Sequence, residues 1–317
     1  MKIGFFSGSD ISIPFLEAII DDVALVVTLK PKVRERGNTL TANPVKIFAE
    51  NKNKAVLEIE TFTPEVIEKI QSYNLEAFVV FSFGKILPKE VLELVKCPLN
   101  IHPSNLPFYR GASPIERQLM DGVTKSAVTI FKMSEKIDKG EIIAKKEFDV
   151  TTNDDYFSFL EKVYRVGIPL LRDSLSCCLE ESCSSMEQKS GGNYAKKIRK
   201  EEEIIGWNNP AASVHNKVRA LTRIGAYTCF RGKKLKVFKS ELTNNVIETP
   251  QKPGSIVLVT SDSFVVACSE GAVKVLEVQL ENKKRMSSKD FINGYKPKIG
   301  EVLNEDCSPY KDCASQG

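Results

Sequence analysis

Apolar runs of strand length alternate with helical patterns along the first half of the chain. Residues 2–6 and 23–29 are continuous apolar runs, which are typical of strands buried on both faces of a parallel sheet. Strand and helix in repetition predict an α/β fold with a Rossmann-like, doubly wound and mostly parallel sheet. Further strands are expected at residues 77–81, 99–102, 127–133 and 141–148, and helices at residues 14–20, 89–95 and 156–178. Three more helices are expected to begin after the capping residues Asn43, Thr63 and Ser113, each of which precedes a Pro.

A Ser- and Gly-rich stretch at residues 180–193 interrupts this pattern and indicates a linker. Beyond it, a helix is expected from Pro210 to about Thr222, followed by short strands that Gly-containing turns separate. Five short strands with little helix predict a small OB-like β-barrel. These strands are expected at residues 226–230, 235–242, 255–259, 264–268 and 273–278, which gives an α/β domain (1–180), a linker (181–203), a barrel domain (204–304) and a tail (305–317).

The composition is that of an ordinary two-domain globular protein. The chain has 317 residues, of which 42% are hydrophobic and 27% are charged. No apolar run is long enough to cross a membrane, and the first residues read as a strand rather than a signal peptide. The eight Cys residues form no CxxC pair and only two His residues are present. We therefore expect a reduced cytoplasmic compartment and no metal site, also at the close group Cys177, Cys178 and Cys183.

The net charge of +4 is modest but unevenly distributed. Between Lys189 and Lys236 there are twelve Lys and Arg residues against three Asp and Glu residues. A local excess of this size favours a polyanionic partner, although a solvated surface without any partner explains it equally well.

Polar residues at the end of one predicted strand suggest chemistry. Asn100 and His102 are two residues apart, so their side chains share one face of the strand. Ligands of doubly wound sheets bind beyond the carboxyl ends of the strands. An Asn can donate a hydrogen bond to a developing oxyanion, a His can move a proton at neutral pH, and Asp138 could orient the imidazole. Each residue alone is as well explained by turn or surface chemistry, so the triple is a hypothesis at this point.

The stretch from Asn100 to Ile115 resembles the signature of the folate-dependent formyltransferase family. That signature reads Asn-x-His, a Ser-Leu-Leu-Pro loop, then Arg-Gly and a helix. Asp138, followed by Gly140, falls where the family places its catalytic Asp. The resemblance extends over residues 1–303. Pro103 and Asn105 depart from the pattern, because Gly and Leu are usual at these two positions.

This resemblance implies an enzyme that transfers a formyl group from 10-formyltetrahydrofolate, which it binds as a substrate, without a metal. It implies that Asn100, His102 and Asp138 form the catalytic set of the domain at residues 1–180. The folate pocket is expected from two loops, with the lining residues Ser104, Asn105, Leu106, Pro107, Phe83, Gly84, Ile86 and Leu87.

A long basic connection after the second strand indicates the acceptor. It spans residues 29–44 and carries four basic side chains, and connections of this length are often functional. In family members that act on tRNA, a basic loop here meets the acceptor stem. The expected acceptor is therefore the α-amino group of initiator methionyl-tRNA, for translation initiation, bound by a monomer whose barrel domain contacts tRNA. The predicted tRNA contacts are Lys30, Lys32, Arg34, Arg36, Lys196, Lys197, Arg199, Arg231, Lys233 and Lys234.

Two other functions stay open. One is an N-formyltransferase acting on an amino-sugar nucleotide, since such enzymes can carry a similar C-terminal region. The other is a non-catalytic RNA-binding protein. A dinucleotide-dependent dehydrogenase is disfavoured, because the turn after the first strand lacks the GxGxxG motif.

Overall fold

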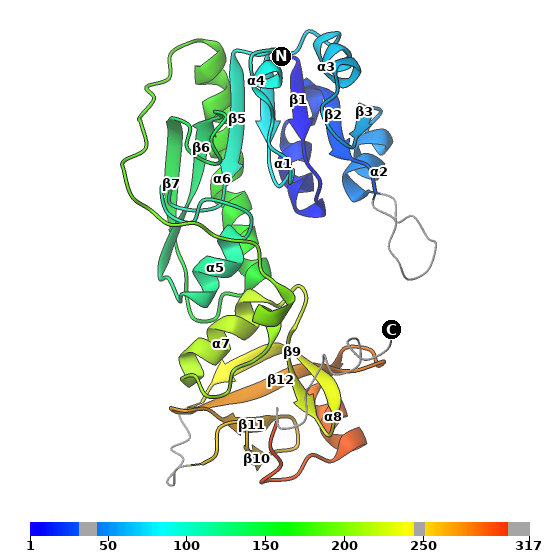
Figure 1. Ribbon diagram of the computed structural model, residues 1–317, viewed down its shortest axis with the longest axis vertical. Coiled ribbons are helices and arrows are strands. Elements are labelled where there is room, and N and C mark those ends of the chain that lie inside the picture. The colour runs from blue at the N-terminus through cyan, green and yellow to red at the C-terminus, as the bar shows by residue number, and fades with distance from the viewer. Residues whose placement is uncertain (32–42, 244–250, 304–317) are drawn as a thin grey trace, which may run out of the picture. The chain divides into compact units, whose positions relative to one another are not determined.

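The computed structural model describes residues 1–31, 43–243 and 251–303 (Figure 1). The chain divides into two compact units that are discontinuous in sequence. Unit 1 comprises residues 1–114, 125–149 and 161–196, and unit 2 comprises residues 115–124, 150–160 and 197–317. Two short segments from the first half of the chain therefore pack with the C-terminal part.

Unit 1 is built on a seven-stranded sheet in the order β3-β2-β1-β4-β5-β6-β7. The first five strands in this order pair in parallel, whereas β5–β6 and β6–β7 are antiparallel. This mixed, mostly parallel α/β sheet confirms the predicted fold class. The strands are β1 (Ile3–Phe6), β2 (Val23–Leu29), β3 (Ala55–Ile59), β4 (Ala77–Val80), β5 (Cys97–His102), β6 (Lys125–Lys132) and β7 (Ile142–Asp149).

The helices of the first half begin where the sequence places capping residues. The Asn43 side chain accepts a hydrogen bond from the Val45 amide, and the Thr63 hydroxyl accepts one from the Val66 amide. Pro occupies the first position of both helices, where its missing N–H costs nothing. The helices are α1 (Ile13–Ala18), α2 (Pro44–Asn51), α3 (Pro64–Gln71), α4 (Lys89–Leu92), α5 (Pro114–Met120) and α6 (Tyr156–Leu179), with 3-10 turns at Asp10–Ser12 and Ile20–Asp22.

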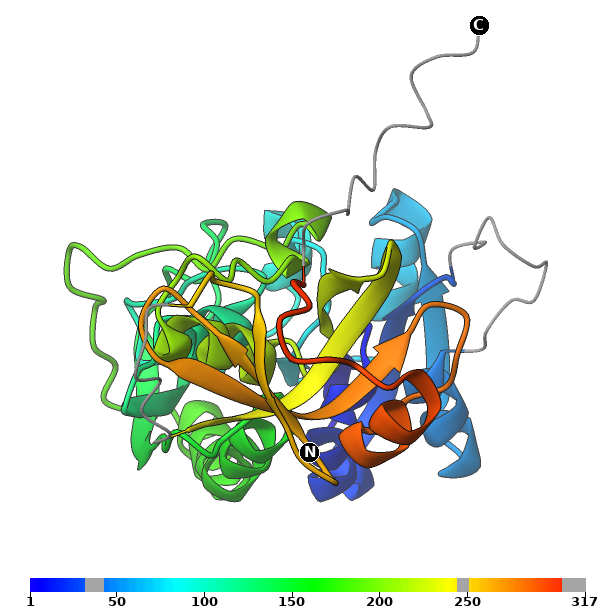
Figure 2. The same cartoon turned by 90° about the horizontal axis from the view of Figure 1, so that it is seen from below.

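Unit 2 is an antiparallel β domain, as the turn pattern predicts. Its strands follow the order β10-β11-β12-β9-β8, and β13 pairs with β12. Figure 2 shows the two long strands of this sheet, β9 in yellow and β12 in orange, side by side. The elements are a 3-10 turn (Lys200–Glu203), α7 (Ala211–Ala220), β8 (Ala226–Phe230), β9 (Lys233–Leu242), β10 (Ile256–Val259), β11 (Phe264–Ala267), β12 (Ala272–Leu280), β13 (Met286–Ser287) and α8 (Ser288–Tyr295).

The core of unit 2 is aromatic at its centre. Trp207, Phe264 and Phe291 are at most 3% exposed and lie in one apolar cluster. The indole Nε1–H of Trp207 donates to the Thr228 hydroxyl at 3.0 Å, so the one polar atom of this side chain is satisfied inside the core. At the edge of the unit, the Arg117 guanidinium hydrogen-bonds to Glu202 and lowers the pKa of that carboxyl to about 2. This pair ties the α5 segment to the start of the C-terminal part.

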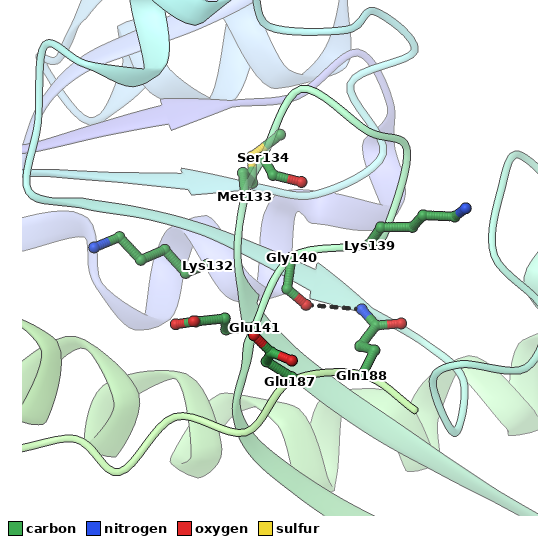
Figure 3. A pocket seen from close by; sticks show the side chains of 8 residues that line it. All are labelled: Lys132, Met133, Ser134, Lys139, Gly140, Glu141, Glu187 and Gln188. Carbon is green, nitrogen blue, oxygen red and sulfur yellow. Dashed lines mark hydrogen bonds between the residues drawn. The ribbon is translucent and has the colours of Figure 1, made fainter. Parts of the chain in front are cut away.

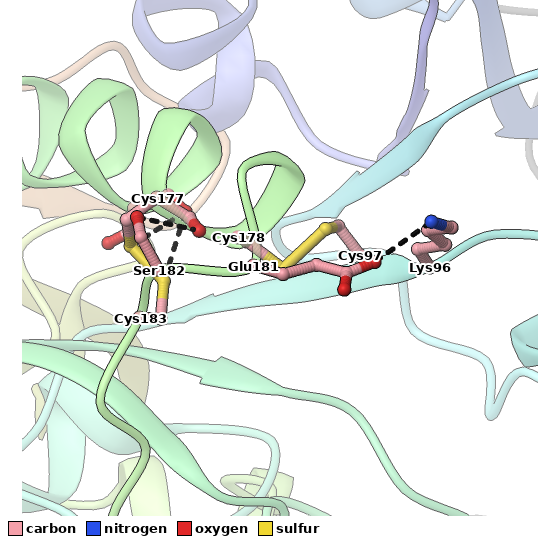
Figure 4. Close-up of a disulfide and its surroundings, with 8 residues drawn as sticks. Lys96, Cys97, Cys177, Cys178, Glu181, Ser182 and Cys183 are labelled. Carbon is pink, nitrogen blue, oxygen red and sulfur yellow. Dashed lines mark hydrogen bonds and ion pairs between the residues drawn. A yellow bond between two sulfur atoms is a disulfide. The ribbon is translucent and has the colours of Figure 1, made fainter.

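Two disulfides join cysteines within the described residues, which differs from the expected reduced state. Disulfides link Cys97 to Cys178 and Cys177 to Cys183 (Figure 4). Cys97 is the first residue of β5, whereas Cys177 and Cys178 lie in the last turn of α6. The chain then reverses direction, which brings Cys183 back to the helix end. The sequence spacing does not reveal this contact, because 81 residues separate Cys97 from Cys178.

Among the described helices, none is both long enough and apolar enough to cross a membrane.

The Cys97–Cys178 bridge leads to a test of stability. A disulfide that closes a long loop typically stabilises the folded state by about 2–4 kcal/mol. We expect Cys97→Ser to lower the melting temperature, and a reductant to lower that of the wild-type protein at least as far, because it also opens the Cys177–Cys183 bridge. Peptide mapping under non-reducing conditions should recover the linked peptides. Free thiols at Cys97 and Cys178 together with an unchanged melting temperature would contradict the bridge.

Candidate active site

His102 is the last residue of β5 and is held by the loop that follows it. Its Nε2 lies 2.8 Å from the carbonyl oxygen of Tyr109, which can only accept, so Nε2 carries the proton. The imidazole is 4% exposed. Its other nitrogen, Nδ1, lies 3.8 Å from Oδ2 of Asp138. This separation is longer than a hydrogen bond, so Nδ1 is available to a third group that contacts both residues.

Asp138 reaches His102 from the connection between β6 and β7. Its Oδ2 accepts a hydrogen bond of 2.7 Å from the amide of Gly111, which follows the Arg110 of the β5–α5 loop. Position 140, two residues after Asp138, requires a glycine, because a Cβ there would overlap the carbonyl oxygen of Lys132. The fold therefore brings the predicted His–Asp pair together, which the sequence alone could not show.

Three residues around this pair have left-handed backbone conformations. Ser82, Tyr109 and Asp138 have φ values of 52°, 59° and 49°. Such conformations cost free energy for residues other than Gly, and they cluster at functional sites where the surrounding structure enforces them. Tyr109 binds the His102 imidazole through its carbonyl oxygen and Asp138 faces it, so two strained loops meet at the pair, while Ser82 follows the neighbouring strand β4.

Asn100 lies beside the start of the folate-pocket segment that the sequence predicts after β4. Val80 pairs with Asn100 in the parallel β4–β5 ladder, so residues 81–88 leave the sheet beside it. The Asn100 side chain is half-buried and makes no hydrogen bond within the described part of the chain. A half-buried carboxamide without a partner at the strand end is suited to a ligand oxygen.

Three large apolar side chains are exposed in the loops of this site. Ile86, Phe108 and Ile137 are 60%, 51% and 50% exposed, and they belong to the loops after β4, β5 and β6. Exposed apolar side chains among polar groups often mark a ligand site. These three loops are therefore a candidate ligand site.

The predicted folate-lining residues divide into buried and accessible ones. The Ser104 hydroxyl is buried and donates to the carbonyl oxygen of Phe108 at 2.6 Å, while Leu106 is packed with Phe131 and Ile142. These two side chains support the loop from inside. Phe83 and Leu87 are buried, whereas the accessible members of the set are Asn105, Pro107, Gly84 and Ile86.

The second histidine, His215, has a structural role. His215 lies in α7 of unit 2, where Nδ1 contacts the Ser240 hydroxyl at 3.0 Å and Nε2 contacts the Thr152 carbonyl oxygen at 3.0 Å. Burial lowers the pKa of this imidazole and so favours its neutral form. Both ring nitrogens are used within the protein, so His215 is not a candidate for the reaction.

The predicted tRNA contacts differ in how much of their side chains is available. Lys30, Lys196, Lys197 and Lys233 are exposed, whereas Lys32, Arg34 and Arg36 lie outside the described residues. Arg199 lies 3.5 Å from Glu202 and is largely exposed. Arg231 is committed internally, because its guanidinium binds Glu301 and the carbonyl oxygens of Tyr295 and Lys296.

Lys234 lies in a crowded cationic surface of unit 2. Its ammonium is 3.7 Å from the centre of the Tyr227 ring. Burial lowers the pKa of this ammonium, and the nearby positive charges of Lys236 and Lys200 lower it further. Glu203 and Glu281 offset part of this effect, but the net shift is downward, so a phosphate would further relieve the repulsion among these cations.

A cavity of about 400 Å³ opens beside the Asp138 loop (Figure 3). Polar and charged groups line most of it, and Gly140 and Gln188 lie on its wall. Within the described ranges, no group of three His, Cys, Asp or Glu side chains is arranged to hold a metal ion.

Sequence reasoning missed two residues that contact the Asp138 loop. Arg110 is 6% exposed, and its Nε donates to the Asp138 carbonyl oxygen at 3.1 Å. Gln188 donates to the same oxygen at 2.9 Å, from the polar segment that the composition marks as a linker. Arg110 belongs to the Arg-Gly pair of the signature, but nothing in the sequence distinguishes Gln188.

Known proteins match nearly the whole chain. Residues 16–172 match the formyl transferase family and residues 197–296 match the formyl transferase C-terminal domain. The methionyl-tRNA formyltransferase of Carboxydothermus hydrogenoformans is 35% identical over 310 residues, which are 96% of this chain and 99% of that protein. This chain belongs to the methionyl-tRNA formyltransferase family.

Solved structures confirm the fold at lower identity. An N-formyltransferase from Helicobacter canadensis, in complex with folinic acid and dTDP-3-aminofucose, is 19% identical with a TM-score of 0.64, covering 90% of this chain and 100% of that one. HypX from Aquifex aeolicus, in complex with tetrahydrofolic acid, is 18% identical with a TM-score of 0.65, covering 95% of this chain and 48% of that one. Since a sugar enzyme shares the fold, the fold alone does not select the acceptor.

The geometry predicts the effect of removing each member of the His–Asp pair. We expect His102→Ala to lower turnover by about 10²–10⁴, the usual loss for a general acid–base group. Asp138→Asn should have a comparable effect. Turnover and melting temperature should be measured for both variants, with His215→Asn as a control that should lower stability rather than turnover. Wild-type turnover in either variant would remove that residue from the mechanism.

Proposed function

We propose that this protein transfers the formyl group of 10-formyltetrahydrofolate to the α-amino group of initiator methionyl-tRNA. The observation that carries the proposal is the arrangement of Asn100, His102 and Asp138 at the end of β5. It stands in a chain that is 35% identical to a methionyl-tRNA formyltransferase over almost its full length. The same relationship favours tRNA over an amino-sugar nucleotide as acceptor, because the matched sugar enzyme is only 19% identical.

Asn100 and His102 act on the reacting carbonyl group. The free carboxamide of Asn100 donates a hydrogen bond to the formyl oxygen as this oxygen gains negative charge. The Tyr109 carbonyl fixes the proton of the neutral imidazole on Nε2. Nδ1 of His102 can therefore accept the proton that the attacking amine loses, directly or through a water molecule.

Asp138 stabilises the imidazolium that results. Its carboxylate lies 3.8 Å from Nδ1, and the Gly111 amide keeps it in place. The bond between the formyl carbon and the folate nitrogen then breaks, and this nitrogen takes up the proton held on Nδ1 as tetrahydrofolate departs. An α-amino group has an ordinary pKa of about 7.7–8.0, so a substantial fraction of the acceptor is neutral and able to attack.

Binding of the tRNA uses basic surfaces in both parts of the chain. Phosphate contacts are suited to the exposed cations Lys196, Lys197 and Lys233 and to the partly buried Lys234. The sequence supplies a second basic group in the connection at residues 29–44. We propose that the protein acts as a monomer in the cytoplasm, where translation begins, and that it needs no metal.

An acceptor panel tests the function directly. With 10-formyltetrahydrofolate as donor, we expect formylation of initiator methionyl-tRNA and much slower or no transfer to an amino-sugar nucleotide or to glycinamide ribonucleotide. The product can be quantified by mass spectrometry of the released aminoacyl group. Preferred transfer to the amino sugar would replace the proposed acceptor, and binding of tRNA without any transfer would identify a non-catalytic RNA-binding protein.

A salt series tests the basic surfaces. Arg34→Ala combined with Arg36→Ala, and separately Lys233→Ala combined with Lys234→Ala, should weaken tRNA binding. Each lost phosphate contact should reduce the slope of log affinity against log salt concentration by up to about one unit.

The control for this series removes two lysines of unit 1 outside both surfaces, Lys54→Ala with Lys69→Ala. It changes the net charge equally and should leave the slope unchanged, while folate affinity should stay constant throughout. Equal slopes in wild type and in one of the two test variants would exclude that surface from tRNA binding.

A further inference from the structure

Gln188 is turned inward in a segment that otherwise faces the solvent. From Ser184 to Tyr194, each residue except Gln188 is exposed. This segment runs along the β5–α5 loop, where the Tyr109 amide donates to the Asn193 side chain and the Ala195 amide donates to the Arg110 carbonyl oxygen. These backbone contacts hold the segment against the loop, but they do not explain why one glutamine points away from the solvent.

The carboxamide of Gln188 uses all of its hydrogen-bonding capacity at the Asp138 turn. Its Nε2 donates to the carbonyl oxygens of Asp138 and Gly140, both at 2.9 Å. Its Oε1 accepts from Arg110, at 3.1 Å from Nε and 2.7 Å from Nη2. Figure 3 shows Gln188 pointing toward Gly140. Two donors and two acceptor positions are the full inventory of a carboxamide.

No other side chain of similar size can make this set of contacts. A glutamate could still bind Arg110, but it has no N–H group for the two carbonyl oxygens and would repel them. A methionine would fill the space without any hydrogen bond. The contacts therefore require an amide at position 188, which provides a way to separate their effects.

The position of the Asp138 turn depends on such contacts. The cavity of about 400 Å³ beside Gly140 leaves part of the turn without close side-chain packing. Asp138 has a left-handed backbone, which its surroundings must enforce. Hydrogen bonds from Gln188 and Arg110 to the Asp138 carbonyl oxygen supply this constraint, because they fix the peptide group next to the side chain that faces His102.

We propose that Gln188 is a positioning residue for the reaction. Its carboxamide, together with Arg110, holds the Asp138–Gly140 turn so that the Asp138 carboxylate stays beside Nδ1 of His102. The proposal rests on the proposed function, which assigns Asp138 its role. It assigns a catalytic consequence to a segment whose composition indicates only a linker.

The first test compares two variants that add the same charge to the same segment. Gln188→Glu keeps the Arg110 contact and loses both bonds to the turn, whereas Ser190→Glu changes an exposed neighbour. We expect Gln188→Glu to lower kcat by about 10–100-fold, since a displacement of about 1 Å can cost this much. The KM values for folate and tRNA should change by no more than roughly twofold. Wild-type kcat in Gln188→Glu, or the same loss in Ser190→Glu, would overturn the proposal.

The second test asks whether Gln188 acts through Asp138. Gln188→Met should lower kcat in the wild-type background but cause little further loss in an Asp138→Asn background, because the group that it positions has already been altered. Losses that multiply independently in the double variant would overturn the proposal. The melting temperatures of all variants separate this outcome from general unfolding.

The third test needs no catalytic activity. The Gly111 amide donates to the Asp138 carboxylate, so its hydrogen exchange reports the position of that side chain. Exchange at Gly111 should accelerate in Gln188→Met and Gln188→Glu but not in Ser190→Glu, and unchanged exchange would overturn the proposal. A wild-type protein that formylates none of the acceptors would overturn the proposed function alone, since Gly111 exchange still shows whether Gln188 holds the turn.

Discussion

The active site depends on how the Asp138 turn is held. The connection from β6 to β7 begins at the amino end of β5, where the Met133 amide donates to the Pro98 carbonyl oxygen. Asp138 must nevertheless face His102 at the opposite end of that strand, four residues from Pro98 and therefore roughly 13 Å away. The chain covers it with an exposed loop, and the Gly111 amide and the Arg110 guanidinium fix its end. These hydrogen bonds hold the Asp138 carboxylate near the imidazole of His102.

The two histidines show how surroundings decide the role of a residue. His102 and His215 are both nearly inaccessible to solvent. Both ring nitrogens of His215 contact groups of unit 2, and burial lowers its pKa, so it serves packing. In His102 one nitrogen is committed to a backbone carbonyl and the other faces a carboxylate across a gap. Nδ1 of His102 therefore makes no hydrogen bond to the carboxylate, unlike the ring nitrogens of His215, which both contact partners directly.

Positive charge is also used in two ways in unit 2. Arg231 binds a carboxylate and two carbonyl oxygens, and thereby anchors the segment after α8 to the first hairpin. Lys234 lies only three positions later, yet burial and the nearby charges of Lys236 and Lys200 lower its pKa. The sequence shows both as members of one basic stretch. Only the contacts distinguish the structural cation from those available to a polyanion.

The sequence by itself determined the fold class and most elements, and it predicted Asn100, His102 and Asp138 as the catalytic triple. Continuous apolar runs marked the buried strands, because such strands have no solvent-facing side. It did not reveal β3, an edge strand with the mixed burial of Ala55–Ile59, nor the short α8, although Ser287 caps that helix by accepting from the Asp290 amide. The matched signature located Asn100, His102 and Asp138, since these residues are local in sequence or identified by family spacing.

Only the tertiary structure shows which residues distant in sequence contact the Asp138 turn and the start of β5. Gln188 meets Asp138 across 50 positions, and the cysteines of β5 and α6 meet across 81. Composition describes the average polarity of a segment, so residues 180–193 read as a linker, while a single inward carboxamide leaves no signal in that average. Long-range hydrogen bonds are selected by backbone geometry that no local pattern encodes, and here they place the groups around Asp138.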